Sequence, residues 1–137
     1  MAAFGSPLVE IIIIVFMFMA GANFSLYFRV WQFKGWNLLR DKEFRIYSLI
    51  FLGATTVVTW DLMRNDSAEG FGRAILDSLF QVISILTTTG FATADFDAWP
   101  ALSRMLLIAL FFVGGCAGST AGSMKVMRMV IGVKSAL

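Results

Sequence analysis

The chain has 137 residues, of which 58% are hydrophobic and 15% are charged, whereas a globular domain has roughly 45–50% apolar and about 25% charged residues. Its mean hydropathy is +0.79. More apolar side chains are present than one small core can bury, so we expect a lipid bilayer to cover the surplus. The 11 basic and 9 acidic residues leave a net charge of +2, which is too small to indicate a nucleic-acid partner.

The absence of histidine and the single cysteine, Cys116, argue against an enzyme. Histidine is the commonest general base and zinc ligand, so Ser-His and Cys-His pairs and histidine metal sites cannot form within this chain. The enzymatic alternative is an intramembrane hydrolase with Ser119 or Cys116 as nucleophile. It has no histidine as base, and Lys125 lies across a predicted loop, so we do not expect catalysis.

The first apolar segment has no charged residue from 11 to 28, and Pro7 suits a first helical turn. We predict a transmembrane helix within residues 1–29, followed by a cytoplasmic linker over 30–43. The first seven residues carry no basic group, so the segment lacks the positive start of a signal peptide and is better interpreted as a retained span.

The second apolar segment has no charged residue from 46 to 60. It is slightly short for a span, but Arg45 and Asp61 at its ends can extend toward the interface, and Tyr47 and Trp60 are residue types that favour the interface. We predict a transmembrane helix over 44–64.

A shorter helix is predicted over 70–86, because its apolar residues recur on one helical face. It would reach only about 22–24 Å, less than a hydrocarbon core of ~30 Å. It leads into Thr87-Thr88-Thr89-Gly90-Phe91, and the half-length helix with this polar segment indicates a re-entrant loop over 87–98. An amphipathic helix lying on the membrane surface has the same periodicity and is the alternative.

The third apolar segment, 99–134, contains a run of small residues at 114–123 with four glycines. Each glycine destabilises a helix by roughly 1 kcal/mol relative to alanine, so we predict a helix broken by an intramembrane loop. The alternative is an unbroken helix with a close crossing, for which Gly114, Gly118 and Gly122 have the small-xxx-small spacing.

The charges predict an orientation. The first linker and the C-terminal tail are rich in lysine and arginine. Residues 61–73 carry three acids against two arginines, and the segment with Asp95 and Asp97 is acidic. The positive-inside bias places the linker and the tail in the cytoplasm. The topology is consistent if 70–98 enters and leaves on the outer side.

A helix, a re-entrant half-helix with an extended Thr/Gly segment, and a second helix form the unit from which potassium-selective filters are made. Gly90 permits the positive φ that lets successive carbonyls converge on a dehydrated cation. Asp95 and Asp97 would raise the cation concentration at the outer mouth. The candidate potassium-binding residues are Thr87, Thr88, Thr89, Gly90 and Phe91.

These motifs resemble a known family. The segment 87–96, together with 114–122 and Lys125, is similar to the third pore repeat of the Trk-type bacterial potassium uptake membrane subunit, of the Trk/Ktr/HKT superfamily. Residues 21–27 resemble the end of the last helix of the preceding repeat. The resemblance covers most of the chain. Ser123 departs from the family loops, which often carry a further glycine there.

The resemblance implies an all-α membrane protein with a potassium-channel-like M1-P-M2 unit, one of four such repeats around a pore. It implies a potassium ion as cargo, a multi-pass protein in the bacterial inner membrane, the other pore repeats and lipid as neighbours, a homodimer, and a cytoplasmic nucleotide-binding (Trk-A-like) regulatory subunit. The implied gating loop beneath the filter comprises Gly114, Gly115, Cys116, Ala117, Gly118, Ser119, Thr120, Ala121, Gly122 and Lys125.

One filter strand cannot encircle an ion. We therefore expect the chain to be part of a longer transporter rather than a short protein that closes a pore as a homo-oligomer. A different class of function remains as the alternative, namely a small membrane-anchoring or assembly protein whose glycines serve helix packing. That alternative predicts no dependence on ions and tolerance of larger residues at Gly90.

Overall fold

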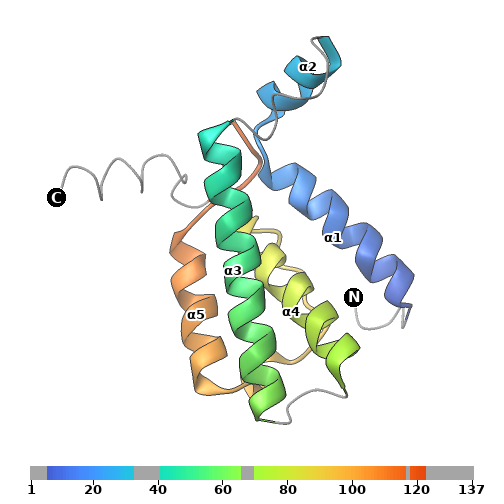
Figure 1. The fold of residues 1–137 in the computed structure, drawn as a ribbon, viewed down its shortest axis with the longest axis vertical. Coiled ribbons are helices and arrows are strands. Elements are labelled where there is room, and N and C mark those ends of the chain that lie inside the picture. The colour runs from blue at the N-terminus through green and yellow to red at the C-terminus, as the bar shows by residue number, and fades with distance from the viewer. Residues whose placement is uncertain (1–5, 33–40, 66–69, 117, 123–137) are drawn as a thin grey trace, which may run out of the picture.

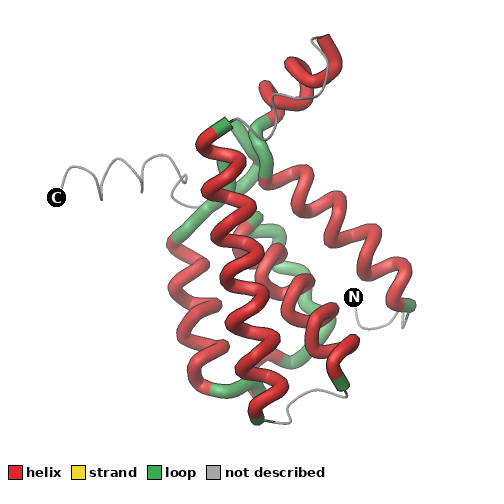
Figure 2. The backbone as a smooth tube through the Cα atoms, in the orientation of Figure 1, coloured by secondary structure: helices red, strands yellow, loops and turns green. Residues whose placement is uncertain are grey.

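The computed structural model describes residues 6–32, 41–65, 70–116 and 118–122. Within these ranges the regular elements are all helical (Figures 1 and 2). In chain order they are α1 (Pro7–Gly21), α2 (Phe24–Gln32), α3 (Lys42–Arg64), α4 (Phe71–Leu86), the short 3-10 helix η3 (Phe96–Ala98) and α5 (Ala101–Phe112).

Local sequence accounts for several helix ends. Pro7 occupies the first turn of α1, where its missing N–H has no helical partner to lose. The Asp41 carboxylate caps α3 by accepting hydrogen bonds from the backbone N–H groups of Glu43 and Phe44. Gly70 precedes α4 with φ +113°, a conformation that glycine adopts readily.

Helix α4 occupies the centre of the bundle and packs against α1, α3 and α5. Its Phe80, Val82, Ile83 and Leu86 have no exposed surface. Tyr47 of α3, which is also fully buried, belongs to the same core. Helix α4 is therefore covered by other helices of the bundle along most of its length.

The N-terminal helical segment is interrupted, which differs from the continuous helix expected within 1–29. Helix α1 ends at Gly21, Ala22 is extended with φ −85° and ψ 162°, and α2 begins at Phe24. The Asn23 side chain accepts a hydrogen bond from the Ser25 N–H, so asparagine caps the second helix as it does at many helix starts. Figure 1 shows α2 projecting away from the other helices.

Large apolar side chains remain exposed along the bundle. Examples are Phe16 of α1 at 67%, Leu49 of α3 at 72% and Met105 of α5 at 72%. By length and composition, α3 is the only described helix that could cross a membrane, and α1 and α5 are shorter apolar helices. Exposed apolar faces on three helices fit contact with lipid or with other apolar protein surfaces rather than with water.

Buried polar contacts join the helices. The Asp61 carboxylate of α3 accepts hydrogen bonds from the backbone N–H of Ser103 (3.0 Å) and from its hydroxyl (2.6 Å), and so caps the start of α5 from a different helix. Arg73 of α4 forms ion pairs with Glu10 of α1 and Asp77 of its own helix, both at 2.9 Å. These contacts fix α5 relative to α3, and α1 relative to α4.

Candidate functional site

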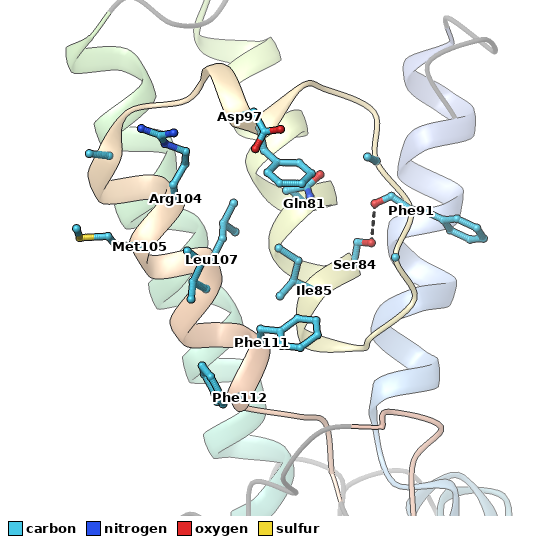
Figure 3. Close-up of a pocket in the computed structure, with 15 residues that line it drawn as sticks. Gln81, Ser84, Ile85, Phe91, Asp97, Arg104, Met105, Leu107, Phe111 and Phe112 are labelled. Carbon is cyan, nitrogen blue, oxygen red and sulfur yellow. Dashed lines mark hydrogen bonds between the residues drawn. The ribbon is translucent and has the colours of Figure 1, made fainter.

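Residues 87–91 turn back along α4. The N–H of Thr87 still bonds to the carbonyl of Ile83, and the N–H of Thr89 bonds to the carbonyl of Ser84 at 2.9 Å. The Ser84 hydroxyl then donates to the carbonyl of Phe91 at 2.6 Å, as Figure 3 shows. The segment therefore leaves the helix end and is fixed beside its last turns by a buried serine.

Two residues of this segment adopt positive φ. Gly90 has φ +76°, and Thr88 has φ +54° although it is β-branched; such a conformation is a strained one for threonine. Thr87 is buried, and its hydroxyl lies 2.7 Å from that of Thr89. Residues 88–91 are exposed, so they face a space that the described residues do not fill.

The small-residue run forms no helix in its described part. Helix α5 ends at Phe112, and residues 114–116 and 118–122, which we call the glycine loop, are non-helical. A helix crossing through Gly114, Gly118 and Gly122 is therefore contradicted. Ala117, Ser123 and Lys125 lie outside the described residues.

The glycine loop crosses to the break between α1 and α2. The Cys116 N–H donates to the carbonyl of Gly21 at 3.0 Å, and Thr120 donates to the carbonyl of Ala20 from both its N–H (3.4 Å) and its hydroxyl (3.2 Å). The Phe24 N–H donates in return to the carbonyl of Gly118 at 3.4 Å. The loop thus pairs with backbone groups that lie 94 to 100 positions earlier in the sequence.

Close contacts explain why two positions of the site are occupied by glycine. A Cβ atom on Gly115 would lie 2.7 Å from the carbonyl oxygen of Gly21. A Cβ atom on Gly21 would meet the Tyr47 hydroxyl and would lie 2.7 Å from the Thr87 methyl group. Both glycines allow backbones to approach more closely than any side chain would permit.

One hydrogen bond joins the two motifs. The Gly122 N–H of the glycine loop donates to the Thr88 hydroxyl at 2.8 Å. Sequence reasoning found both motifs but could not place them in contact. It noted residues 21–27 only for the family resemblance and Tyr47 only as an interfacial residue type, and it assigned no positioning role to these residues or to Ser84. Asparagine is a common N-cap residue, so Asn23 was a signal in the sequence for the start of a new helix.

The acidic residues Asp95 and Asp97 are both exposed. The Asp95 carboxylate accepts from the Asp97 N–H at 3.2 Å and caps η3. Asp97 also lines a cavity of about 680 Å³ between α4, α5 and residues 90–92. Figure 3 shows Gln81, Ile85, Leu107 and Phe111 around it, so most of the lining is apolar.

Comparison with known proteins gives a consistent result. The profile of the family TrkH, described as "Cation transport protein", matches residues 1–137. The Trk system potassium uptake protein TrkH of Halomonas elongata is 36% identical over 138 residues, which cover 98% of this chain and 28% of that protein. The Trk system potassium uptake protein TrkG of Escherichia coli K12 is 34% identical over 129 residues, 93% of this chain and 26% of that protein.

A solved structure has the same fold. The crystal structure of the potassium transporter TrkH from Vibrio parahaemolyticus matches 99% of this chain and 31% of its own chain, with a TM-score of 0.91 and 34% sequence identity. The sequence described here thus spans less than a third of the length of these relatives.

Proposed function

Because the chain belongs to the TrkH family of cation transport proteins, we propose that it forms part of a potassium transporter and supplies one filter strand and one gating loop. In the M1-P-M2 description, α3 is M1, α4 is the pore helix, and α5 with the glycine loop is the first part of M2. The observation that carries this proposal is the contact of the exposed 88–90 segment with the glycine loop through Thr88 and Gly122.

Three features support the filter role of residues 87–91. The segment follows a half-length helix that is buried by three others, which is the arrangement that irregular backbone at membrane depth requires. Positive φ at Thr88 and Gly90 turns successive carbonyls away from the regular alternation of a strand. The Ser84 hydroxyl fixes the Phe91 carbonyl, so the segment has one defined path.

The gating role of the glycine loop is supported by its position. It is attached by backbone hydrogen bonds to the α1–α2 break and lies against Thr88, the second residue of the filter strand. Few of its side chains are large, so it has little surface to bury and can be displaced at lower cost than a helix. A loop in this place blocks an ion that leaves the inner end of the strand.

The rest of the assembly is proposed from the family. Other pore repeats complete the ring of carbonyls around a potassium ion, and the exposed faces of α1, α3 and α5 contact those repeats or lipid. The protein is a multi-pass protein of the bacterial inner membrane. It acts as a homodimer with a cytoplasmic nucleotide-binding, Trk-A-like regulatory subunit. Asp95 and Asp97 attract cations to the outer mouth.

The test is the flux of rubidium and sodium into proteoliposomes that contain the protein encoded by the longest reading frame around this sequence. Gly90→Ser should lower the ratio of rubidium to sodium flux, because a side chain at φ +76° strains the strand although no atom lies within 4 Å of a Cβ there. The matched control is Gly70→Ser, which also has a positive φ and open space but lies at the start of α4. It should leave the flux ratio unchanged.

Deletion of residues 118–122 tests the gate. It should raise rubidium flux, because the proposed block beneath the filter is removed. An anchoring or assembly protein predicts that neither the deletion nor Gly90→Ser changes any ion flux at equal protein incorporation. That result would contradict both assigned roles.

A further inference from the structure

The end of α1 presents four backbone carbonyls without helical partners, as every helix end does. All four are satisfied by groups outside the helix. The Tyr47 hydroxyl donates to Phe18 at 3.3 Å, and the Tyr27 hydroxyl donates to Met19 at 2.7 Å. The other two acceptors, Ala20 and Gly21, are satisfied by the glycine loop.

The loop and the break satisfy each other in both directions. The start of α2 has unpaired N–H groups for the same reason as the end of α1 has unpaired carbonyls. Its Phe24 N–H uses the Gly118 carbonyl of the loop. Gly118 has φ +78°, and a Cβ atom there would lie 3.0 Å from the Asn23 side-chain oxygen. An unbroken helix would offer none of these groups.

We infer that the α1–α2 break is the receptor that holds the glycine loop closed, and that the Thr88 hydroxyl transmits the position of the loop to the filter strand. The inference deepens the proposed function and rests on it. The residues concerned are positioning residues: Ala20, Gly21 and Asn23 at the break and Thr88 at the strand. When the loop leaves, the carbonyls of Ala20 and Gly21 lose their donors, and water from the opened path must replace them.

The coupling works in both directions. The Thr88 hydroxyl accepts the Gly122 N–H, and Thr88 is strained at φ +54°. Displacement of the loop would break this bond and free a strained residue of the strand. By thermodynamic linkage, an ion that favours one conformation of Thr88 changes the equilibrium position of the loop by the same factor. A bound potassium ion and a closed loop therefore affect each other.

Cys116 provides a readout that does not depend on ion flux. It is fully buried in the closed loop, so its rate of modification by a small thiol reagent reports displacement of the loop. The experiment uses the protein encoded by the longest reading frame around this sequence, reconstituted in proteoliposomes, with every cysteine other than Cys116 replaced by serine.

Gly115→Ala tests the receptor. Its Cβ atom would lie 2.7 Å from the Gly21 carbonyl oxygen and 2.9 Å from the Ser119 hydroxyl, so the loop must move off the break. The modification rate of Cys116 should rise by roughly tenfold, the effect of losing one or two hydrogen bonds. The control is Gly53→Ala in α3, outside the loop and the break, where a Cβ atom meets nothing within 4 Å. In this control variant, Cys116 should be modified at the same rate as in the parent protein.

Thr88→Val tests the connection to the strand. It removes the acceptor for the Gly122 N–H at nearly constant shape, and should raise the Cys116 modification rate roughly three- to tenfold. Thr88→Ser retains the hydroxyl, so Cys116 in this variant should be modified at the parent rate. Potassium in place of choline in the medium should change the modification rate of the parent, and this difference should shrink in Thr88→Val.

The outcomes separate this inference from the proposed function. If Cys116 is modified at the same rate in Gly115→Ala as in Gly53→Ala, the receptor is refuted, even where deletion of 118–122 raises flux. If Cys116 in Thr88→Val is modified at the parent rate, the connection to the strand is refuted. If the modification rates change as expected while that deletion leaves flux unaltered, the loop is held as described but is not the gate.

Discussion

Gly21 lies where α1, α3 and the segment 87–91 meet, and replacing it by alanine should destabilise the protein. The added Cβ atom would meet the Tyr47 hydroxyl, which is fully buried, and would lie 2.7 Å from the Thr87 methyl group. Neither neighbour can turn into open space. Overpacking of this kind costs about 1–3 kcal/mol, so we expect the free energy of unfolding to fall by that amount.

Tyr47→Phe identifies the cause. The hydroxyl donates to the Phe18 carbonyl at 3.3 Å, so its removal alone should cost about 1 kcal/mol or less. In the Gly21→Ala background the same change removes the nearest obstruction. The double variant should therefore be more stable than the sum of the two single effects predicts, with incomplete recovery because Thr87 remains in the way.

The assay is denaturant unfolding of the longest reading frame in detergent, followed by tryptophan fluorescence. The control is Gly53→Ala in α3, where a Cβ atom meets nothing within 4 Å, and where alanine should stabilise the helix by about 0.5–1 kcal/mol. Equal stability of Gly21→Ala and the parent, or exact additivity of the two changes at positions 21 and 47, would refute the packing argument.

Three further predictions concern the polar contacts. Asp61→Leu should lower the free energy of unfolding by about 1–3 kcal/mol, and Ser103→Ala by less, because the backbone N–H of Ser103 keeps its acceptor; a denaturant titration in detergent compares them. Arg73→Leu should cost about 1–3 kcal/mol, since it leaves buried carboxylates on α1 and α4 without their hydrogen-bonding partner, whereas Arg73→Lys should cost less in the same titration. Ser84→Ala frees the Phe91 carbonyl and should lower the rubidium-to-sodium flux ratio up to roughly tenfold; an unchanged ratio would contradict the role of this bond.

The sequence was most informative where local patterns decide the structure. The family was identified from two motifs, and the match over residues 1–137 confirms it. Apolar runs located the segments that contain α1, α3 and α5, and four glycines weakened the helix after Phe112. Each of these signals lies within one stretch of chain, so periodicity and helix propensity are sufficient to detect it.

Contacts between distant segments could not be predicted. The uncharged run 11–28 concealed the break after Gly21, because the hydropathy pattern continues across it and the partners of its backbone groups lie at 116–120. The cap of α5 by Asp61 crosses 42 positions in the same way. Asp61 instead appeared as an end residue that could extend to the membrane interface. Pairings of this kind arise from tertiary packing.

The most direct test of the central claim is the uptake of rubidium by proteoliposomes, with this chain alone compared with the longest reading frame around it. The proposal is that the chain supplies one strand and one loop to a path that other repeats complete. It predicts uptake from the longer protein and none from the chain alone at equal incorporation. Uptake by the chain alone would contradict the account, because it would mean that copies of this one unit close a potassium path by themselves.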